Sequence, residues 1–223
     1  MIINETEAAI TIEPEQNAEY AIIWLHGLGA NGHDFVPMLD YLPWHTEKPI
    51  RFIFMNAPSR MITVNAGMVM PAWYDIYSLQ NLDLEDRTGI KESERMIINV
   101  LDEQMHQGIE AEHIILGGFS QGGSMALYTT LRFAYGLAGA VCLSGYLPQR
   151  DELEDDEMNL NTPLFLAHGL QDDIVPTELF EISCNFLKEK GFCLSEHSYS
   201  MGHEVAAAEW RDLSQWLKSS LKI

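Results

Sequence analysis

The chain has 223 residues, of which 13 are basic and 33 acidic, so its formal net charge is −20. Proteins that bind nucleic acids need Lys and Arg to contact phosphates, and this acidic excess argues against that class. The same charge disfavours electrostatic docking on an anionic membrane surface. A hydrophobic fraction of 47% and a charged fraction of 21% are typical of a globular protein with a substantial core.

The cysteines and the N-terminus bear on the cellular compartment. Three cysteines without a Cys-x-x-Cys pair leave at least one thiol unpaired, so a disulfide framework is not expected. The N-terminal residues lack the basic region and the apolar run of a signal peptide, and no run of 18 apolar residues occurs. The sequence therefore predicts a cytoplasmic protein without integral membrane association. The cysteines are Cys142, Cys184 and Cys193.

Short apolar runs alternate with amphipathic stretches along the chain. This alternation predicts one α/β domain over residues 1–223, with a mostly parallel central sheet and helices on both faces. Continuous apolar runs are typical of strands buried on both faces, whereas partial alternation indicates edge strands. Buried strands are predicted at 20–25, 51–55, 113–116, 138–143 and 164–167, and edge strands at 8–13 and 192–199.

The amphipathic stretches carry apolar residues every three or four positions, the spacing of helices that pack on a sheet. In 177–190 the predicted buried face consists of Leu179, Ile182, Phe186 and Leu187. Helices are predicted at 89–107, 124–132, 177–190 and 204–219.

Two longer connections stand out, 57–88, which has weak periodicity, and 144–162. Long connections in compact domains often serve function, and 57–88 is the one candidate for a lid. The second connection contains six acidic residues within 151–157. A charge run of this kind is expected to be a solvated loop.

The strongest local motif is Gly-Phe-Ser-Gln-Gly at residues 118–122, which follows the apolar run 113–116 and precedes a predicted helix. In a strand–turn–helix context, Gly-x-Ser-x-Gly is typical of a nucleophile elbow, and it predicts Ser120 as a nucleophile. The serine would lie at a helix N-terminus, where backbone N–H groups face developing negative charge. Gly118 and Gly122 are expected because a Cβ at either would collide across the turn. The structural alternative is a glycine-rich turn that closes a strand.

A serine hydroxyl needs a base to become nucleophilic, and in folds of this kind the chain order is serine, acid, histidine. Three histidines follow Ser120. His203 lies between the last predicted strand and the last helix, where α/β sheets place their active sites, and is the predicted base. His168 precedes the acid candidates, and His197 lies inside a predicted strand.

The acid candidates are Asp172 and Asp173, in a loop that leaves the strand at 164–167. The acid would accept the N–H of His203 and fix its tautomer. Spacing alone leaves the choice open, and the other aspartate would be a turn residue or a helix cap ahead of Pro176.

An oxyanion hole requires two backbone N–H groups. One is predicted at Gln121, the residue after the nucleophile, and the other at Leu28, in a glycine-containing loop after the strand at 20–25. A phosphate-binding loop is not supported, because G-x-G-x-x-G and Gly-Lys-Ser/Thr are absent. His-Glu-x-x-His and Cys/His clusters are also absent, so no metal or organic cofactor is expected and His26 is predicted to be a structural hydrogen-bonding residue.

Five sequence blocks occur in a characteristic order, at residues 25–29, 70–75, 117–123, 168–176 and 202–203. They read Leu-His-Gly-Leu-Gly, Met-Pro-Ala-Trp-Tyr-Asp, Gly-Gly-Phe-Ser-Gln-Gly-Gly, His-Gly-x-x-Asp-x-x-Val-Pro and Gly-His. Together they resemble the phospholipase/carboxylesterase family, which contains small bacterial carboxylesterases and the acyl-protein thioesterases that also cleave lysophospholipids. The resemblance covers nearly the whole chain.

The resemblance implies a single-domain α/β-hydrolase fold and favours Asp172 over Asp173 as the acid. It also implies that Leu28 and Gln121 supply the oxyanion N–H groups and that the loop with Trp73 flanks an acyl channel. Trp73 is then expected to be a substrate-binding residue in the channel wall, with a packed aromatic residue as the alternative. The acidic run is not part of the family pattern. It places charge near the expected rim of the site and disfavours anionic substrates.

These features predict a serine hydrolase that cleaves carboxylic esters or thioesters through an acyl-enzyme on Ser120. Its substrate would be a small acyl ester or thioester, an acylated protein or a lysophospholipid. The oligomeric state is left open, a homodimer included. A lipase or peptidase on the same fold is one alternative, and a catalytically inactive acyl-chain-binding protein is another, although all three triad residues are present.

Overall fold

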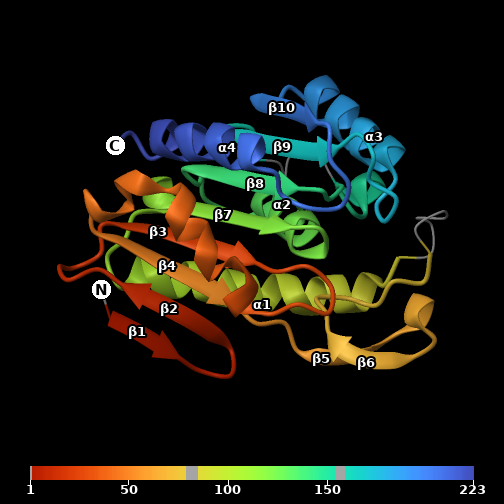
Figure 1. Cartoon of the computed structure of the whole chain (residues 1–223), viewed down its shortest axis with the longest axis horizontal. Coiled ribbons are helices and arrows are strands. Elements are labelled where there is room, and N and C mark those ends of the chain that lie inside the picture. The colour runs from red at the N-terminus through yellow and green to blue at the C-terminus, as the bar shows by residue number, and fades with distance from the viewer. Residues whose placement is uncertain (1, 79–84, 154–158) are drawn as a thin grey trace.

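The computed structural model describes residues 2–78, 85–153 and 159–223, which pack around an eight-stranded sheet (Figure 1). Its strand order is β1–β2–β4–β3–β7–β8–β9–β10. The six strands from β4 to β10 are parallel, whereas β1 and β2 pair antiparallel at one side. The strands are β1 (Ile2–Glu5), β2 (Ala9–Glu13), β3 (Tyr20–Leu25), β4 (Ile50–Met55), β7 (Ile114–Phe119), β8 (Gly139–Leu143), β9 (Leu164–Gly169) and β10 (Leu194–Tyr199).

Helices cover both faces of the sheet, as the sequence predicts (Figure 1). Successive strand residues point to opposite faces, so the neighbours Ile23 and Trp24 of β3 enter two different apolar clusters. The sheet face that carries Ile23 packs against α1 and α2. The face that carries Trp24 packs against α4 and the 3₁₀ helix η1. A third cluster joins α2 and α3 to β8 and β9. The longer helices are η1 (Gly32–Tyr41), α1 (Arg87–His106), α2 (Gln121–Arg132), α3 (Thr177–Glu189) and α4 (Ala207–Ser220).

The seven predicted strands are all present, but one edge assignment is wrong. Strand 192–199 corresponds to β10, which lies at an edge of the sheet as predicted. Strand 8–13 corresponds to β2, which is covered by β1 on its outer side. The prediction missed β1 because its four residues, Ile-Ile-Asn-Glu, are all exposed and carry no alternating apolar pattern.

The four predicted helices are also present, but the buried face of α3 differs from the prediction. Of the predicted face, Leu187 is buried but Ile182 is 41% exposed, whereas Phe180 and Cys184, which were not predicted, are packed in the core. Both sets of residues recur at helical spacing, so periodicity alone could not choose between them. The cluster that α3 forms with β8 and β9 selects the face that carries Phe180.

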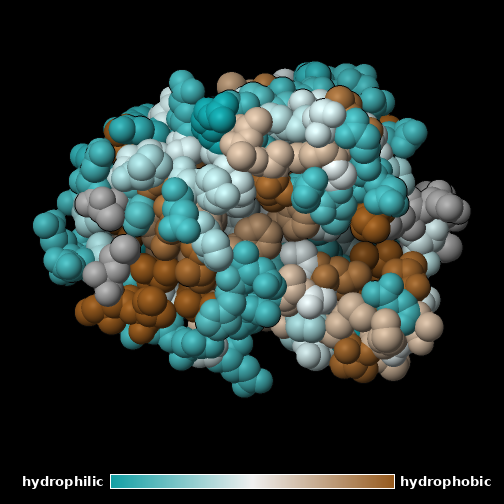
Figure 2. All heavy atoms as spheres, in the orientation of Figure 1, coloured by the Kyte–Doolittle hydropathy of each residue, from teal (hydrophilic) through white to brown (hydrophobic). Residues whose placement is uncertain are grey.

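The connection 57–88 contains a second, two-stranded sheet that the sequence did not predict. Strands β5 (Ser59–Ile62) and β6 (Met68–Pro71) pair antiparallel and project from the main body (Figure 1). Met61, Met68 and Val69 are each more than half exposed, and Figure 2 shows an apolar surface in this part of the molecule. The hairpin escaped prediction because its side chains do not alternate between a core and solvent.

Two sequence features concern the surface. The acidic run 151–157 extends into residues 154–158, which lie outside the described residues, so its predicted solvation is not tested. Among the described residues, no helix has both the length and the apolar character needed to cross a membrane.

Glu209 is an unusual core residue, because it lies in the first turn of α4 with none of its surface exposed. Burial penalises the ionised carboxylate and raises the pKa of Glu209 from 4.5 to about 8, partly offset by the backbone N–H of Ala206. Folding therefore takes up a proton at neutral pH. The carboxyl group lowers the free energy of unfolding progressively as the pH rises from about 5 to about 8.

We predict that Glu209→Gln stabilises the protein in a pH-dependent manner. The gain in the free energy of unfolding should grow by up to about 1.4 kcal/mol per pH unit between about pH 5 and pH 8 and then level off. Urea unfolding at several pH values measures it, with Glu181→Gln on the exposed side of α3 as the matched control. A gain that does not vary with pH would contradict the prediction.

Candidate active site

Ser120 occupies a strained turn between β7 and α2. Its backbone has φ 55° and ψ −123°, a conformation that residues other than glycine rarely adopt. Two backbone hydrogen bonds hold the turn: the Ser120 N–H donates to the Leu143 carbonyl at 2.7 Å, and the Ser124 N–H donates to the Ser120 carbonyl at 3.0 Å. This geometry presents the hydroxyl at the N-terminus of α2 and matches the predicted elbow.

The flanking glycines make the turn possible, as the sequence predicts. A Cβ at Gly118 would lie 2.5 Å from the carbonyl carbon of Gly122, and a Cβ at Gly122 would lie 2.2 Å from the carbonyl oxygen of Leu25. Both contacts are with backbone atoms, which cannot move without distorting the main chain. The first turn of α2 is thereby packed directly against the end of β3.

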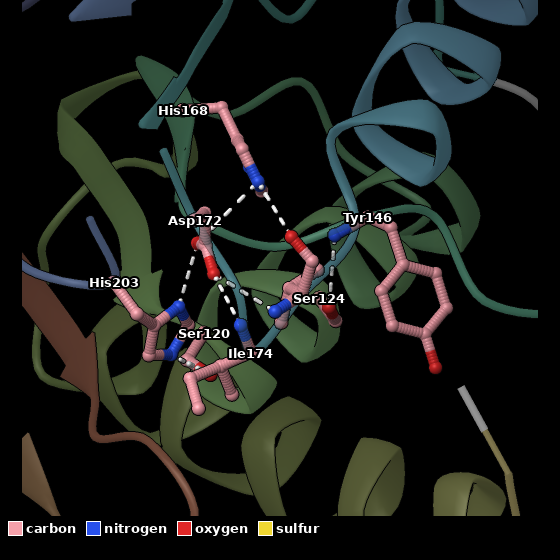
Figure 3. A network of polar contacts seen from close by, with 8 residues as sticks. Ser120, Ser124, Tyr146, His168, Asp172, Ile174 and His203 are labelled. Carbon is pink, nitrogen blue, oxygen red and sulfur yellow. Dashed lines mark hydrogen bonds and ion pairs between the residues drawn. The ribbon is translucent and has the colours of Figure 1, made fainter. Parts of the chain in front are cut away.

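The structure brings Ser120, His203 and Asp172 into one hydrogen-bonded chain (Figure 3). The Ser120 Oγ lies 2.9 Å from the His203 Nε2, and the His203 Nδ1 lies 2.7 Å from the Asp172 Oδ2. The three residues follow β7, β9 and β10, at the carboxyl edge of the parallel sheet. Asp173, the other acid candidate, is exposed and is not part of this chain in the described structure.

The loops that carry the acid and the histidine are joined by their backbones. The Leu170 N–H donates to the Tyr199 carbonyl at 2.8 Å, and the Gln171 N–H donates to the Met201 carbonyl at 3.0 Å. A Cβ at Gly169 would lie 2.3 Å from the carbonyl oxygen of Gly202, so the two loops are in close contact. The hydrogen bond between Asp172 and His203 follows from this packing.

Both oxygens of the Asp172 carboxylate have hydrogen-bond partners, and its side chain has no exposed surface. The backbone N–H groups of Ile174 and Val175 each donate to Oδ1 at 2.9 Å, which leaves Oδ2 to face His203. A carboxylate in this position accepts the Nδ1–H of the imidazole, so the Nε2 lone pair is available to accept the serine proton.

The predicted oxyanion residues Leu28 and Gln121 both line the cavity beside Ser120. Gln121 is the first residue of α2, where N–H groups have no acceptor within the helix. Its side chain is engaged elsewhere: Oε1 accepts the Trp73 N–H at 2.9 Å, and Nε2 donates to the Tyr74 carbonyl at 2.7 Å.

His26 is a structural hydrogen-bonding residue, as predicted, and it orients the peptide before Leu28. Its Nε2 accepts the Ala57 N–H at 3.0 Å, so Nδ1 carries the proton and donates to the Gly27 carbonyl at 2.7 Å. Burial lowers the pKa of His26 and keeps the ring neutral. Because a trans peptide directs its C=O and N–H to opposite sides, this bond turns the Leu28 N–H away from the His26 ring.

Trp73 does not have the predicted position in the cavity wall. Its side chain is fully buried, and its indole N–H donates to the His26 carbonyl at 2.8 Å. It therefore supports the Leu28 loop from behind, and the adjacent Tyr74 lines the cavity in its place. The packed-aromatic alternative for Trp73 is the correct one, since a donor in the indole ring needs an acceptor when it is buried.

A cavity of about 600 Å³ opens beside Ser120, within the size range of small-molecule sites. The connection 57–88 contributes part of its wall through Val64 and Ile76, and the acid loop contributes Ile174 and Val175. The sequence did not predict these wall residues, because an apolar side chain in a loop does not by itself indicate a binding site. The apolar side chains of the wall are Leu28, Ala30, Phe35, Val64, Tyr74, Ile76, Phe119, Tyr146, Ile174 and Val175.

Ser124 ties two parts of this wall together. Its hydroxyl, one helical turn after Ser120, accepts the Tyr146 N–H at 3.1 Å (Figure 3). The loop after β8 is thus fixed to the helix that carries Ser120. In the described part of the chain, the site included, no group of three or more His, Cys, Asp or Glu side chains is arranged to hold a metal ion.

The mostly parallel sheet, the strained serine turn and the His–Asp pair at its carboxyl edge define an α/β-hydrolase. Residues 6–221 match the phospholipase/carboxylesterase family, and the chain belongs to that family. It is therefore a hydrolase of the esterase and thioesterase class.

Similar proteins agree with this assignment. Acyl-protein thioesterase 1 of Kluyveromyces lactis is 37% identical over 236 residues, which span all of both chains. Among solved structures, acyl-protein thioesterase 2 of Zea mays is 30% identical with a TM-score of 0.82, covering 96% of this chain and 98% of the other. Esterase PE8 is 26% identical with a TM-score of 0.81, covering 95% of this chain and 97% of the other.

We predict that Gly122→Ala destabilises the protein even though alanine favours helices. Helix propensity alone would add up to about 1 kcal/mol of stability. The clash with the Leu25 carbonyl should instead lower the free energy of unfolding by about 2 kcal/mol or more. Urea unfolding checks this, with Gly136→Ala as the control, because a Cβ there meets no atom closer than 3.8 Å. A Gly122→Ala protein as stable as the parent would contradict the proposed packing of the elbow.

Proposed function

We propose that this protein is a serine hydrolase that cleaves carboxylic esters and thioesters through an acyl-enzyme on Ser120. The observation that carries the proposal is the chain Ser120–His203–Asp172, with contacts of 2.9 and 2.7 Å, at the mouth of an apolar cavity of about 600 Å³. The cavity supplies a place for the acyl chain, and the hydrogen-bonded chain supplies an activated nucleophile.

In the acylation half-reaction, the His203 Nε2 removes the proton of the Ser120 hydroxyl while Oγ attacks the substrate carbonyl. The carbonyl oxygen becomes an oxyanion that accepts hydrogen bonds from the Leu28 and Gln121 N–H groups. One such donor lowers the barrier by roughly 3–4 kcal/mol. Collapse of the intermediate breaks the bond to the leaving alcohol or thiol, which takes the proton from His203.

In the deacylation half-reaction, His203 removes a proton from water, and the hydroxide attacks the ester carbonyl on Ser120. The same two N–H groups stabilise the second oxyanion. Ser120 then leaves with the proton from His203, and the carboxylic acid is released. Asp172 stabilises the imidazolium that forms in both half-reactions.

We propose an acyl ester or thioester with an apolar acyl chain as the substrate. The names of the relatives, acyl-protein thioesterases, support an acylated protein. The family description, phospholipase/carboxylesterase, supports a phospholipid ester as a second candidate, and we propose a lysophospholipid in that class. Asp34 at the cavity and the net charge of −20 disfavour anionic groups on the acyl chain. All three cysteines are free thiols, which supports a cytoplasmic location.

The main alternative is an acyl-chain-binding protein that lacks catalysis. Binding alone requires neither a strained serine nor a histidine fixed by a buried carboxylate. Backbone strain of this kind persists only where the surrounding structure enforces it and is concentrated at functional sites. We therefore favour the hydrolase.

We predict that Ser120→Ala lowers kcat/KM for p-nitrophenyl butyrate by at least about 10⁴-fold, because no nucleophile remains. Circular dichroism and urea unfolding should show that the fold persists. Ser219→Ala, at an exposed position of α4, is the matched control and should retain full activity. Undiminished hydrolysis by Ser120→Ala would overturn the assignment.

We predict that Asp172→Asn and Asp173→Asn differ sharply. At position 172 an amide could donate to the imidazole and favour the wrong tautomer, so kcat should fall by about 10⁴-fold. At position 173, which is exposed, kcat should stay within about threefold of the parent. Steady-state kinetics of both variants test the choice of acid. Equal losses in both would contradict it.

A further inference from the structure

His168 is a buried histidine that the proposed mechanism does not use. It lies in β9 with none of its surface exposed, and Asp172 lies between it and His203 (Figure 3). The chain order excludes it as the base. Its position against the acid nevertheless places it beside the hydrogen-bonded chain that ends at Ser120.

The hydrogen bonds of His168 assign its tautomer. Its Nε2 lies 3.0 Å from the Val175 carbonyl oxygen, which can only accept, so Nε2 carries the proton. Its Nδ1 is buried and has no hydrogen-bond partner in the described structure. Burial lowers the pKa of His168, and the ring stacks on Phe180 of α3 at a centroid distance of 5.0 Å. The side chain is thus a neutral donor in a fixed orientation.

This donor closes the turn that carries the acid. The Asp172 Oδ1 accepts the N–H groups of Ile174 and Val175, and the Val175 carbonyl accepts the Nε2–H of His168. Residues 172–175 are thereby attached to β9. Ile174 and Val175 also line the substrate cavity, so one turn positions both the acid and part of the cavity wall.

The same nitrogen also lies close to the carboxylate. The His168 Nε2 lies 3.4 Å from the Asp172 Oδ2, the oxygen that accepts the His203 Nδ1–H at 2.7 Å. The His168 N–H group, which donates to the Val175 carbonyl, therefore lies next to the oxygen that His203 uses. The positive end of a neighbouring N–H dipole reduces the negative potential that the carboxylate exerts on the imidazole of His203.

We propose that His168 is a positioning residue of the hydrolytic site: it holds the acid turn in place and moderates the attraction of Asp172 for the His203 proton. This proposal rests on the proposed function, because it acts through Asp172 and His203. The titratable groups that act on His168 are Asp172 in the turn after β9 and His203 in the loop after β10. From α3, the contact is with the apolar ring of Phe180.

Three substitutions at position 168 separate the donor from the bulk of the side chain. His168→Met fills the space without a donor. His168→Gln places an amide N–H near the position of Nε2, whereas His168→Asn places its amide near Nδ1, too far back to reach the Val175 carbonyl. His197→Met in β10 is the matched control, since His197 also stacks on an aromatic ring, that of Phe165.

The expected readout is the acid limb of the pH profile of kcat/KM, normalised to active sites titrated with a fluorophosphonate. Without the N–H group beside Asp172, the His203 imidazolium is stabilised, so the acid limb of His168→Met and His168→Asn should move up by about 0.5 to 1 pH unit. Their kcat/KM at neutral pH should fall about tenfold. His168→Gln should return the acid limb to the pH of the parent and bring kcat/KM within about threefold of the parent. His197→Met should leave the acid limb at the same pH as in the parent.

A merely structural role would reduce the yield or the stability without moving the limb. The proposal is overturned if the limbs of His168→Met and His168→Asn coincide with that of the parent or move down, or if His168→Gln behaves like His168→Asn. If His168→Met does not fold, the comparison of Gln with Asn decides. An NMR titration of His203 needs no substrate, so it tests His168 even if the parent hydrolyses no ester and the proposed function fails.

Discussion

The close contact between the first turn of α2 and the end of β3 is the constraint on which the site depends. Gly122 sits against the carbonyl oxygens of Leu25 and His26, and no side chain fits between them. This contact holds Ser120 at positive φ and brings the N-terminus of α2 next to the loop that begins at His26. Ser120 and the backbone N–H groups of Leu28 and Gln121 are therefore positioned by the same packing.

Buried histidines support the two halves of the site in similar ways. In the loop with Leu28, neutral His26 donates to the Gly27 carbonyl, and Trp73 donates to the His26 carbonyl. On the acid side, His168 donates to the Val175 carbonyl. Each ring fixes the backbone of a loop whose neighbouring groups face the cavity. Both rings are kept neutral by burial, so their hydrogen bonds do not depend on pH near neutrality.

The sequence predicted those parts of the fold that bury apolar side chains at a regular spacing. The continuous apolar runs of β3, β4, β7, β8 and β9 and the spacing in α1, α2 and α4 are direct consequences of packing on a two-faced sheet. Strand β1 and the β5–β6 hairpin have exposed side chains, so hydrophobic periodicity carried no information about them. In α3, two different sets of apolar residues recur at helical spacing, and the tertiary contacts decide which set is buried.

The site was predictable to the extent that its chemistry appears in motifs. The glycine spacing around Ser120 and the order of acid and histidine led to the residues that the structure brings together. The choice of Asp172 over Asp173 came from the family resemblance, because adjacent aspartates have equal spacing. Trp73 was placed in the cavity wall by its position in a motif, but its buried N–H is committed to the His26 carbonyl. The cavity wall itself depends on loop geometry that local sequence does not encode.

The most direct test of the proposed mechanism is covalent labelling with a fluorophosphonate, followed by mass spectrometry of the intact protein and of its peptides. The account predicts one adduct per chain, on Ser120, with loss of p-nitrophenyl butyrate hydrolysis in proportion to labelling. An enzyme that hydrolyses the ester while Ser120 stays unlabelled, or that carries the adduct on another residue, would contradict it.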